Sequence, residues 1–287
     1  MADTSARILS VHGNAVAWSH DGLRLAFANR TKCVAVWELL DSSTVMQMQT
    51  PCGQGLVGSV SWCPDDSKIA GSIGSAVYIW DALSGRDLAV LKGHDEKINA
   101  VAWSPCGSKL ASCSDDTSVR LWDMTTAAEV CAYEGHYMNV MSVDWSPDGN
   151  CLTSGSYDGN VGIWNLDGAD HKMLKGHGDF VTSVAWNPDG KQVASVGLDC
   201  TTRLWDMNRL RSSIVLDDSS GALSSVSWHA NGRKLATASW DRKARIWDLG
   251  KLCKVMEHSH EVDFVSWSPC ADELLTRCRD TLQVWRL

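Results

Sequence analysis

The sequence predicts an all-β protein built from seven similar units, and three observations support that prediction. Two interleaved series of tryptophans recur along the whole chain. A four-residue turn, which usually contains proline, follows each tryptophan of the first series. Between these turns the chain shows short runs that alternate apolar and polar residues, and no segment has a convincing helical pattern.

The tryptophans give the period of the repeat. The chain has 287 residues and contains 15 Trp, against only 4 Tyr and 3 Phe. The first series consists of Trp18, Trp62, Trp103, Trp145, Trp186, Trp228 and Trp267. The second consists of Trp37, Trp80, Trp122, Trp164, Trp205, Trp247 and Trp285, and Trp240 alone lies outside both series. Each unit therefore contains two tryptophans at fixed structural positions.

The strands of a unit are clearest in the third repeat. Residues 98–103 alternate in the manner of a β-strand and are followed by a turn at Ser104–Gly107. Five of the six prolines occupy this turn, where a fixed φ helps and no ladder N–H is needed. Further strands are expected at 109–113, 118–122 and 128–133. Four antiparallel strands in a period of about 40–45 residues predict a β-propeller.

Composition narrows the class of function. The chain has 26 Lys and Arg against 34 Asp and Glu, a net charge of −8, which argues against binding nucleic acid or an anionic membrane through phosphate contacts. The N-terminus has no apolar segment, so no signal peptide is expected. The 11 cysteines form no C-x-x-C pair, which indicates reduced thiols. We therefore expect a cytoplasmic protein, with a nuclear or cytoskeletal assembly as the alternative.

The segment LKGHDEKINAVAWSPCGSKLASCSDDTSVRLWDM, which begins at Leu91, closely resembles a Trp-Asp (WD) repeat of the β-propeller superfamily. Gly-His opens the unit and Trp-Asp closes it. The resemblance extends over the whole chain and is most specific in the three central units. It implies one domain over residues 1–287, a seven-bladed propeller of four-stranded antiparallel blades. Residues 6–11 are expected to complete the last blade, formed by 262–286, because the chain ends after the third strand of that unit.

The resemblance also implies a hydrogen-bonded set of His, Ser, Asp and Trp within a blade. Three complete sets are expected: His94, Ser112, Asp116 and Trp122; His136, Ser154, Asp158 and Trp164; His177, Ser195, Asp199 and Trp205. The other units depart from the pattern. Ser219 replaces the histidine of the sixth unit, Arg279 stands where the seventh should have its Asp, and Thr31 and Gly74 stand there in the first two. We expect residues 94–210 to be the stiffest part of the chain.

Two kinds of chemistry are considered and set aside. A His–Ser–Asp list suggests nucleophilic catalysis, but an active site is not built three times at regular intervals. Cys253, His258 and His260 lie close in sequence, yet they lack the four ligands and the spacing of structural zinc, so a solvated loop is expected. Glycine-rich phosphate loops are missing as well. We therefore expect no enzyme activity, no cofactor and no metal.

The predicted function is that of a non-catalytic interaction scaffold or adaptor, a subunit of an intracellular multiprotein complex. One or more proteins are the expected partners, with no nucleic acid, no membrane and no self-association. Two alternatives stay open at this point. One is an enzyme with a site in the central channel. The other is a propeller that binds phospholipid or nucleic acid through clusters of basic side chains. Two such clusters are Arg203, Arg209 and Arg211, and Arg242, Lys243 and Arg245.

The resemblance places the binding residues on one rim of the propeller, at three positions in each unit. Carried over by spacing, these are Lys97, Asn99 and Asp115; Asn139, Met141 and Tyr157; Phe180, Thr182 and Leu198; Ala222, Ser224 and Trp240; Glu261 and Asp263; and His12, Asn14 and Arg30. A clustered apolar patch marks an interface, and aromatic residues make strong anchors. We therefore expect the contact surface to be centred on Tyr157 and Phe180.

Overall fold

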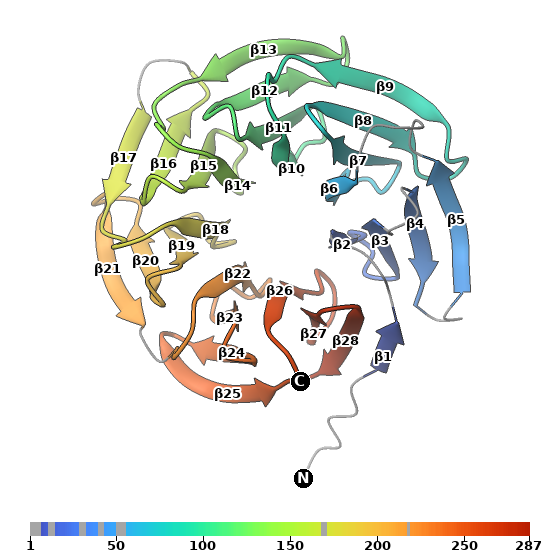
Figure 1. Ribbon diagram of the computed structural model, residues 1–287. Coiled ribbons are helices and arrows are strands. Elements are labelled where there is room, and N and C mark those ends of the chain that lie inside the picture. Colours follow the sequence, from blue (N-terminus) through green and yellow to red (C-terminus); the bar gives the residue numbers. More distant parts are fainter. Residues whose placement is uncertain are drawn as a thin grey trace. The chain divides into compact units, whose positions relative to one another are not determined.

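The computed structural model of the protein describes residues 7–10, 15–28, 33–39, 43–49, 56–167, 171–216 and 219–287 (Figure 1). Every regular element within these ranges is a β-strand, and the strands form seven sheets of four. The prediction of an all-β, seven-bladed β-propeller with four-stranded antiparallel blades is therefore confirmed. The sheets are called blades below and are numbered in chain order.

The structure divides into two compact units, which we describe separately. The N-terminal unit, His12–Trp145, contains the first three blades and the inner strand of the fourth. The first blade consists of β2 (Val16–Trp18), β3 (Arg24–Ala28), β4 (Cys33–Glu38) and β5 (Ser43–Gln49). The second consists of β6 (Val57–Trp62), β7 (Lys68–Ile73), β8 (Ala76–Asp81) and β9 (Asp87–Lys92). The third consists of β10 (Ile98–Trp103), β11 (Lys109–Ser114), β12 (Val119–Asp123) and β13 (Ala128–Tyr133), and β14 (Val140–Trp145) follows.

The C-terminal unit comprises Ser146–Leu287 together with Met1–Val11. The remaining strands of the fourth blade are β15 (Cys151–Ser156), β16 (Asn160–Asn165) and β17 (His171–Lys175). The fifth blade consists of β18 (Val181–Trp186), β19 (Gln192–Gly197), β20 (Thr202–Asp206) and β21 (Arg211–Leu216). The sixth consists of β22 (Leu223–Trp228), β23 (Lys234–Ser239), β24 (Lys243–Asp248) and β25 (Lys251–Glu257). The seventh consists of β26 (Val262–Trp267), β27 (Glu273–Cys278), β28 (Thr281–Arg286) and β1 (Arg7–Ser10).

The expected completion of the last blade by the start of the chain is confirmed for the described residues. β1 pairs antiparallel with β28, and Arg7 lies opposite Val284 while Ser10 lies opposite Thr281. Figure 1 shows β26, β27, β28 and β1 side by side in this order. Residues 6 and 11, the limits of the predicted strand, lie outside the described residues. The pairing gives β28 a partner along its otherwise open edge.

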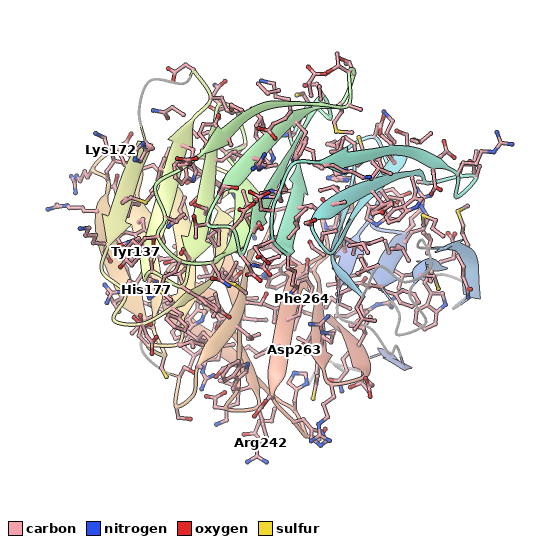
Figure 2. The ribbon with its side chains drawn as sticks, turned by 45° about the horizontal axis from the view of Figure 1, so that its top comes forward. Tyr137, Lys172, His177, Arg242, Asp263 and Phe264 are labelled. Carbon is pink, nitrogen blue, oxygen red and sulfur yellow. The ribbon has the colours of Figure 1, made fainter. Side chains whose placement is uncertain are left out.

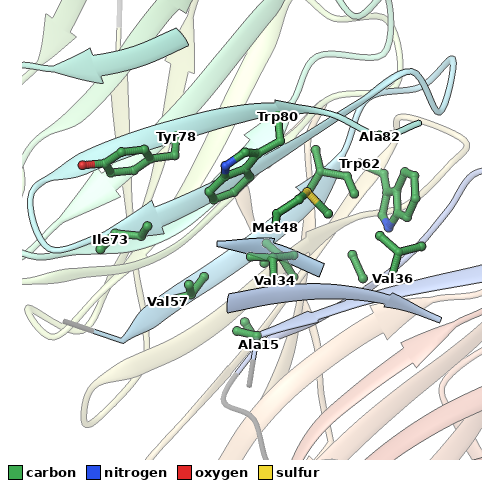
Figure 3. Packing of buried hydrophobic residues seen from close by; sticks show 14 of the residues in the cluster. Ala15, Val34, Val36, Met48, Val57, Trp62, Ile73, Tyr78, Trp80 and Ala82 are labelled. Carbon is green, nitrogen blue, oxygen red and sulfur yellow. The ribbon is translucent and has the colours of Figure 1, made fainter. Parts of the chain in front are cut away.

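Burial changes systematically across a blade, from the inner strand to the outer one. The second strands are almost entirely buried, as in β7, β11, β15, β19 and β23. The outer strands β9 and β13 are mostly exposed. Figure 3 shows the apolar cluster of the first two blades, where Trp80 and Trp62 pack with Met48, Val34 and Ile73. Burial of such side chains supplies the main driving force for folding.

The two tryptophan series have different structural roles. Within the N-terminal unit, two of the tryptophans that end an inner strand reach the preceding blade. The indole Nε1 of Trp62 donates to Ala17 O at 3.2 Å, and that of Trp145 donates to Ala102 O at 3.0 Å. The second series lies within the blade, where Trp80, Trp122, Trp164 and Trp205 are among the largest fully buried side chains. Trp62 and Trp145 thus link neighbouring blades, whereas the indole N–H groups of Trp103, Trp228 and Trp267 are buried without a hydrogen-bond partner among the described residues. The second series fills the interior of the blades.

In the first six blades the turn after the inner strand has one residue in the left-handed conformation. Glycine fills that position at Gly107, Gly149 and Gly190, with φ between 71° and 72°. In the second blade Asp66 takes the same conformation, with φ of 56°. Its carboxylate accepts hydrogen bonds from the backbone N–H groups of His20 and Asp21, at 2.8 and 2.9 Å. Asp66, which stands where other blades have glycine, therefore joins the first and second blades by hydrogen bonds.

Candidate functional site

The His–Ser–Asp–Trp set of the third blade forms one continuous chain of hydrogen bonds. His94 Nδ1 lies 2.7 Å from Asp116 Oδ2, and its Nε2 lies 2.7 Å from Ser112 Oγ. Trp122 Nε1 donates to the same Ser112 Oγ at 2.8 Å. A carboxylate can only accept, so Nδ1 of the neutral ring carries the proton and Ser112 donates to Nε2. The set ties the loop before the inner strand to the hairpin between the second and third strands.

The fifth blade has the same geometry. His177 Nδ1 lies 2.9 Å from Asp199 Oδ2, its Nε2 lies 2.7 Å from Ser195 Oγ, and Trp205 Nε1 donates to Ser195 at 2.8 Å. Burial opposes ionisation of Asp199, but hydrogen bonds from His177 and the Gly178 N–H hold its pKa below the ordinary value. Both serines, Ser112 and Ser195, are completely buried, so neither hydroxyl is open to a dissolved substrate.

The fourth blade has the same tryptophan–serine hydrogen bond. Trp164 Nε1 donates to Ser154 Oγ at 2.8 Å, and Asp158 accepts the backbone N–H of Asn160 at 2.9 Å. His136 is buried, as the equivalent His94 is. In the third blade, burial lowers the pKa of His94 although the hydrogen bond to Asp116 opposes this effect. His94 is therefore neutral near pH 7.

In the sixth blade, which lacks the histidine, an arginine pairs with the structural aspartate. Arg245 lies on β24, and its guanidinium forms a bidentate pair with Asp241, with Nη1–Oδ1 at 3.1 Å and Nη2–Oδ2 at 2.6 Å. Ser219, at the histidine position, binds Ser239 Oγ at 2.8 Å. Trp247 Nε1 donates to Thr237 Oγ1 at 3.2 Å. The buried Asp241 carboxylate thus keeps a cationic partner without a histidine.

The seventh blade lacks a carboxylate for its histidine because its hairpin is shorter. Cys278 pairs directly with Thr281, which leaves the two-residue turn Arg279–Asp280, with Arg279 at φ of 53°. The second blade has the same short hairpin at Gly74–Ser75. Both ring nitrogens of His258 are buried without a hydrogen-bond partner among the described residues. Trp285 still donates to a hydroxyl, Thr276 Oγ1, at 2.9 Å.

In four blades a β-bulge explains why one predicted position reaches the rim. The inner strand skips one residue in its pairing with the second strand, and the skipped residues are Gly58, Asn99, Thr182, Ser224 and Asp263. A bulge redirects a side chain that would otherwise alternate across the sheet. Four of these five residues are sequence-predicted rim residues. Their position on the rim therefore has a backbone cause.

Three of the bulge side chains bind the next blade. Asn99 Nδ2 donates to Val140 O at 2.9 Å, Thr182 Oγ1 donates to Leu223 O at 2.7 Å, and Ser224 Oγ donates to Val262 O at 2.9 Å. The donors are hence engaged within the protein. A carboxylate cannot donate to a carbonyl, and Asp263 accepts instead from Arg277 Nε at 2.7 Å. Burial raises the pKa of Asp263, and Arg277 opposes that rise.

The polar rim residues of the third and fourth inner strands form a bridge. Asp115 Oδ1 accepts from Asn99 Nδ2 and from Asn139 Nδ2, each at 2.7 Å. Met141 contributes its sulfur, 3.6 Å from Asn99 Nδ2. Lys97 is exposed, and its backbone carbonyl accepts the N–H of Asp115 at 2.9 Å. Of this group, the Lys97 side chain is the one most open to solvent.

The aromatic rim residues lie in the C-terminal unit. The rings of Tyr157 and Phe180 are stacked, with centroids 4.4 Å apart and planes inclined by 15°. Both side chains are partly exposed. Leu198, also partly exposed, donates its backbone N–H to Phe180 O at 2.9 Å. The pair spans the β15–β16 hairpin and the loop before β18, so it offers one continuous aromatic surface across two blades.

A cavity of about 330 Å³ opens on the same rim of the sixth and seventh blades. Trp240 and Arg242 line it from the β23–β24 hairpin, and Arg279 lines it from the β27–β28 hairpin. The other lining residues are Ser259, His260, Glu261 and Asp263. Trp240 is 46% exposed. Spacing had placed Trp240, Glu261 and Asp263 on this rim but not the two arginines.

Other sequence expectations have these outcomes. His12, Asn14, Arg30 and Thr31 lie outside the described residues. Within the part of the chain that the structure describes, no group of three or more His, Cys, Asp or Glu is arranged to hold a metal ion. No helix in these ranges is long and apolar enough to cross a membrane. All ten described cysteines are free thiols.

The comparison with known proteins places this fold in a family. The WD domain, G-beta repeat family matches residues 45–81, 85–123, 128–165, 169–206 and 211–248, which is more than half of the chain. The chain therefore belongs to this family, as its repeats predict. The first and seventh blades lie almost entirely outside the matched ranges.

Three curated relatives share parts of the chain. Probable cytosolic iron-sulfur protein assembly protein 1 of Eremothecium gossypii is 34% identical over 122 residues, 39% of this chain and 37% of that protein. Protein HIR1 of Cryptococcus neoformans is 31% identical over 135 residues, 42% of this chain and 15% of that protein. The human U5 small nuclear ribonucleoprotein 40 kDa protein is 49% identical over 57 residues, 20% of this chain and 16% of that protein. The matches thus span well under two thirds of each relative.

Proposed function

We propose that the protein is a non-catalytic interaction scaffold, a subunit or adaptor of an intracellular protein assembly. The observation that carries this proposal is the stacked, partly exposed pair Tyr157 and Phe180. Exposed aromatic side chains held rigidly by their neighbours are suited to anchor a partner. The names of two relatives, an assembly protein and a ribonucleoprotein protein, support a role within complexes.

The buried hydroxyls support a non-catalytic role. A nucleophilic serine must reach its substrate, whereas Ser112 and Ser195 are fully buried and already bonded on both sides. The sets recur in several blades and connect loops, as structural ties do. We further propose that residues 1–287 act as one domain in the cytoplasm. A nuclear assembly is the alternative, because one relative is named a small nuclear ribonucleoprotein protein.

The test is co-purification of partners with the tagged protein. The double variant Tyr157→Ala with Phe180→Ala should fold and lose its main partner. The matched control is Asp148→Ala with Asp189→Ala, two substitutions in the turns at the opposite ends of the fourth and fifth blades. Circular dichroism and thermal melting establish that all variants are folded. Retention of partners by the aromatic variant, with loss in the control, would put the interface on the other rim.

A further inference from the structure

We propose that the cavity lined by Trp240, Arg242, Glu261, Asp263 and Arg279 binds a carboxylate side chain of a partner peptide, with an adjacent apolar residue packed on Trp240. This inference rests on the proposed scaffold function and specifies the chemistry of one partner contact. It starts from the cavity of about 330 Å³ in the sixth and seventh blades, which is large enough for a side chain and its neighbour. Its walls are three separate loops that lie on one rim.

The first argument is the state of the charges in the cavity. Asp263 is paired with Arg277 at 2.7 Å, so its charge is already compensated. The guanidinium groups of Arg242 and Arg279 form no ion pair with any described residue. Glu261 likewise has no ion-pair partner among them. Two uncompensated cations therefore face one uncompensated anion, and the cavity favours an anionic group.

The second argument is the departure of this region from the repeat. Blades three, five and six use a neutral donor at the bulge to bind the next blade, whereas the seventh has Asp263 there. Arg242 and Arg279 both occupy left-handed positions, with φ of 68° and 53°. Gly159 fills the position of Arg242 in the fourth blade with φ of 79°, and Gly74 fills that of Arg279 in the short hairpin of the second blade with φ of 58°. An arginine is less favourable there than glycine, so both positions carry a charge at a conformational cost.

The third argument is the geometry of the two arginine-bearing hairpins. Arg242 ends the β23–β24 hairpin and points away from its sheet, while Asp263 lies on β26 nearer the inner wall (Figure 2). The backbone carbonyl of Arg242 accepts the N–H of His258 at 2.8 Å, which fixes the hairpin against the loop before β26. A planar guanidinium matches a carboxylate better than an ammonium group does. Trp240, 46% exposed beside Arg242, supplies the apolar surface.

The experiment titrates the full-length protein with short capped peptides that carry a trifluoroacetyl group, followed by fluorine NMR. The three probes contain Glu-Leu-Glu, Gln-Leu-Gln or Lys-Leu-Lys between glycines. We expect the acidic probe to bind at least fivefold more tightly than the neutral one, and more weakly at high salt. Arg242→Ala and Arg279→Ala should each weaken it about fivefold, the upper range for a solvent-exposed charge pair.

Two further variants decide the sign of the interaction. Glu261→Gln removes the like charge, so it should tighten the acidic probe about twofold. Arg233→Ala is the matched control, because it removes one arginine of the same blade at the opposite rim, where Arg233 contacts Asp248. This control should change the affinity less than twofold. Circular dichroism establishes that each variant is folded.

Several results would overturn the inference. These are equal binding of the neutral probe, preference for the basic probe, weaker binding by Glu261→Gln, or a phosphoserine probe that binds tenfold better than the glutamate probe. A failure here is distinct from a failure of the scaffold function. If partners co-purify but no acidic probe binds, this inference alone is wrong. If no partner co-purifies at all, the scaffold function fails, whatever the probes do.

Discussion

The Ser112→Ala substitution should destabilise the protein more than its small change in volume suggests. Ser112 Oγ joins two buried groups, because it accepts from Trp122 Nε1 at 2.8 Å and donates to His94 Nε2 at 2.7 Å. Alanine leaves both of them without a partner in a fully buried site. An unsatisfied buried polar group costs about 1–3 kcal/mol, so the loss of two partners should lower the free energy of unfolding by about 2–6 kcal/mol.

Thr237→Val is the internal comparison. Thr237 Oγ1 accepts only from Trp247 Nε1, at the longer distance of 3.2 Å, and no histidine shares the hydroxyl. Valine keeps the shape of threonine, so a loss of about 1–2 kcal/mol is expected. Urea unfolding followed by far-ultraviolet circular dichroism gives both values, provided the slopes agree. Equal losses in the two variants would refute the reasoning that the histidine doubles the penalty.

Three other outcomes are expected. The folded-state pKa of Asp241 is about 2, because burial opposes ionisation of the carboxyl but the ion pair with Arg245 outweighs burial. The unfolded value is near 3.9. The ionised carboxylate therefore stabilises the fold above about pH 4, and this stabilisation is lost as the pH falls toward 2. The urea midpoint of the Asp241→Asn variant should therefore be lower at neutral pH and should change less over this interval, and parallel curves would contradict this. Hydrogen bonds from Ser104 and Ser108 lower the pKa of the exposed Cys106 thiol to about 7. Cys106 should therefore be the first thiol to react with a disulfide reagent at pH 7, and Cys106→Ser should remove this fast phase. A fast phase that persists in the variant would show that another thiol reacts first. Deletion of residues 1–12 removes the strand paired with β28 and should lower the melting temperature or cause aggregation, whereas an unchanged melt would show that this pairing does not contribute.

Much of the fold is predictable from the sequence because the tryptophans mark strand ends. Trp103 and Trp122 lie at the end of β10 and one residue before the end of β12, and the remaining units follow by spacing. The hydrogen-bonded sets can be predicted for the same reason, since their members stand at fixed offsets from those tryptophans. A fixed offset fails where a hairpin changes length. In the seventh blade the turn Arg279–Asp280 is too short to hold the expected carboxylate. The sequence records this shortening, because Trp267 and Trp285 are 18 residues apart, as Trp62 and Trp80 are, whereas the pairs of the other units are 19 apart.

The candidate site was predictable only in part. Spacing placed Tyr157, Phe180 and Trp240 on the rim, but it could not show that Asn99 is engaged by its neighbours. Arg245 escaped notice because its pairing with Asp241 depends on the direction of a side chain along β24. The lining arginines of the cavity come from loops about 40 residues apart. For Arg242 one signal was present in the sequence, because this arginine stands where other hairpins have glycine, threonine or cysteine.

The pairing of β1 with β28 sets a limit on when the protein can fold during its synthesis. Residues 7–10 leave the ribosome long before residues 281–286, so the seventh blade gains its outer strand only after β28 has been made. Domains otherwise begin to fold from the N-terminal side as the chain emerges. β1 has no partner while more than 270 further residues are synthesised. During this time a chaperone or the exposed edge of another β-sheet can bind β1. Closing this one contact between the ends of the chain is a slow search, because its partners are so far apart in sequence.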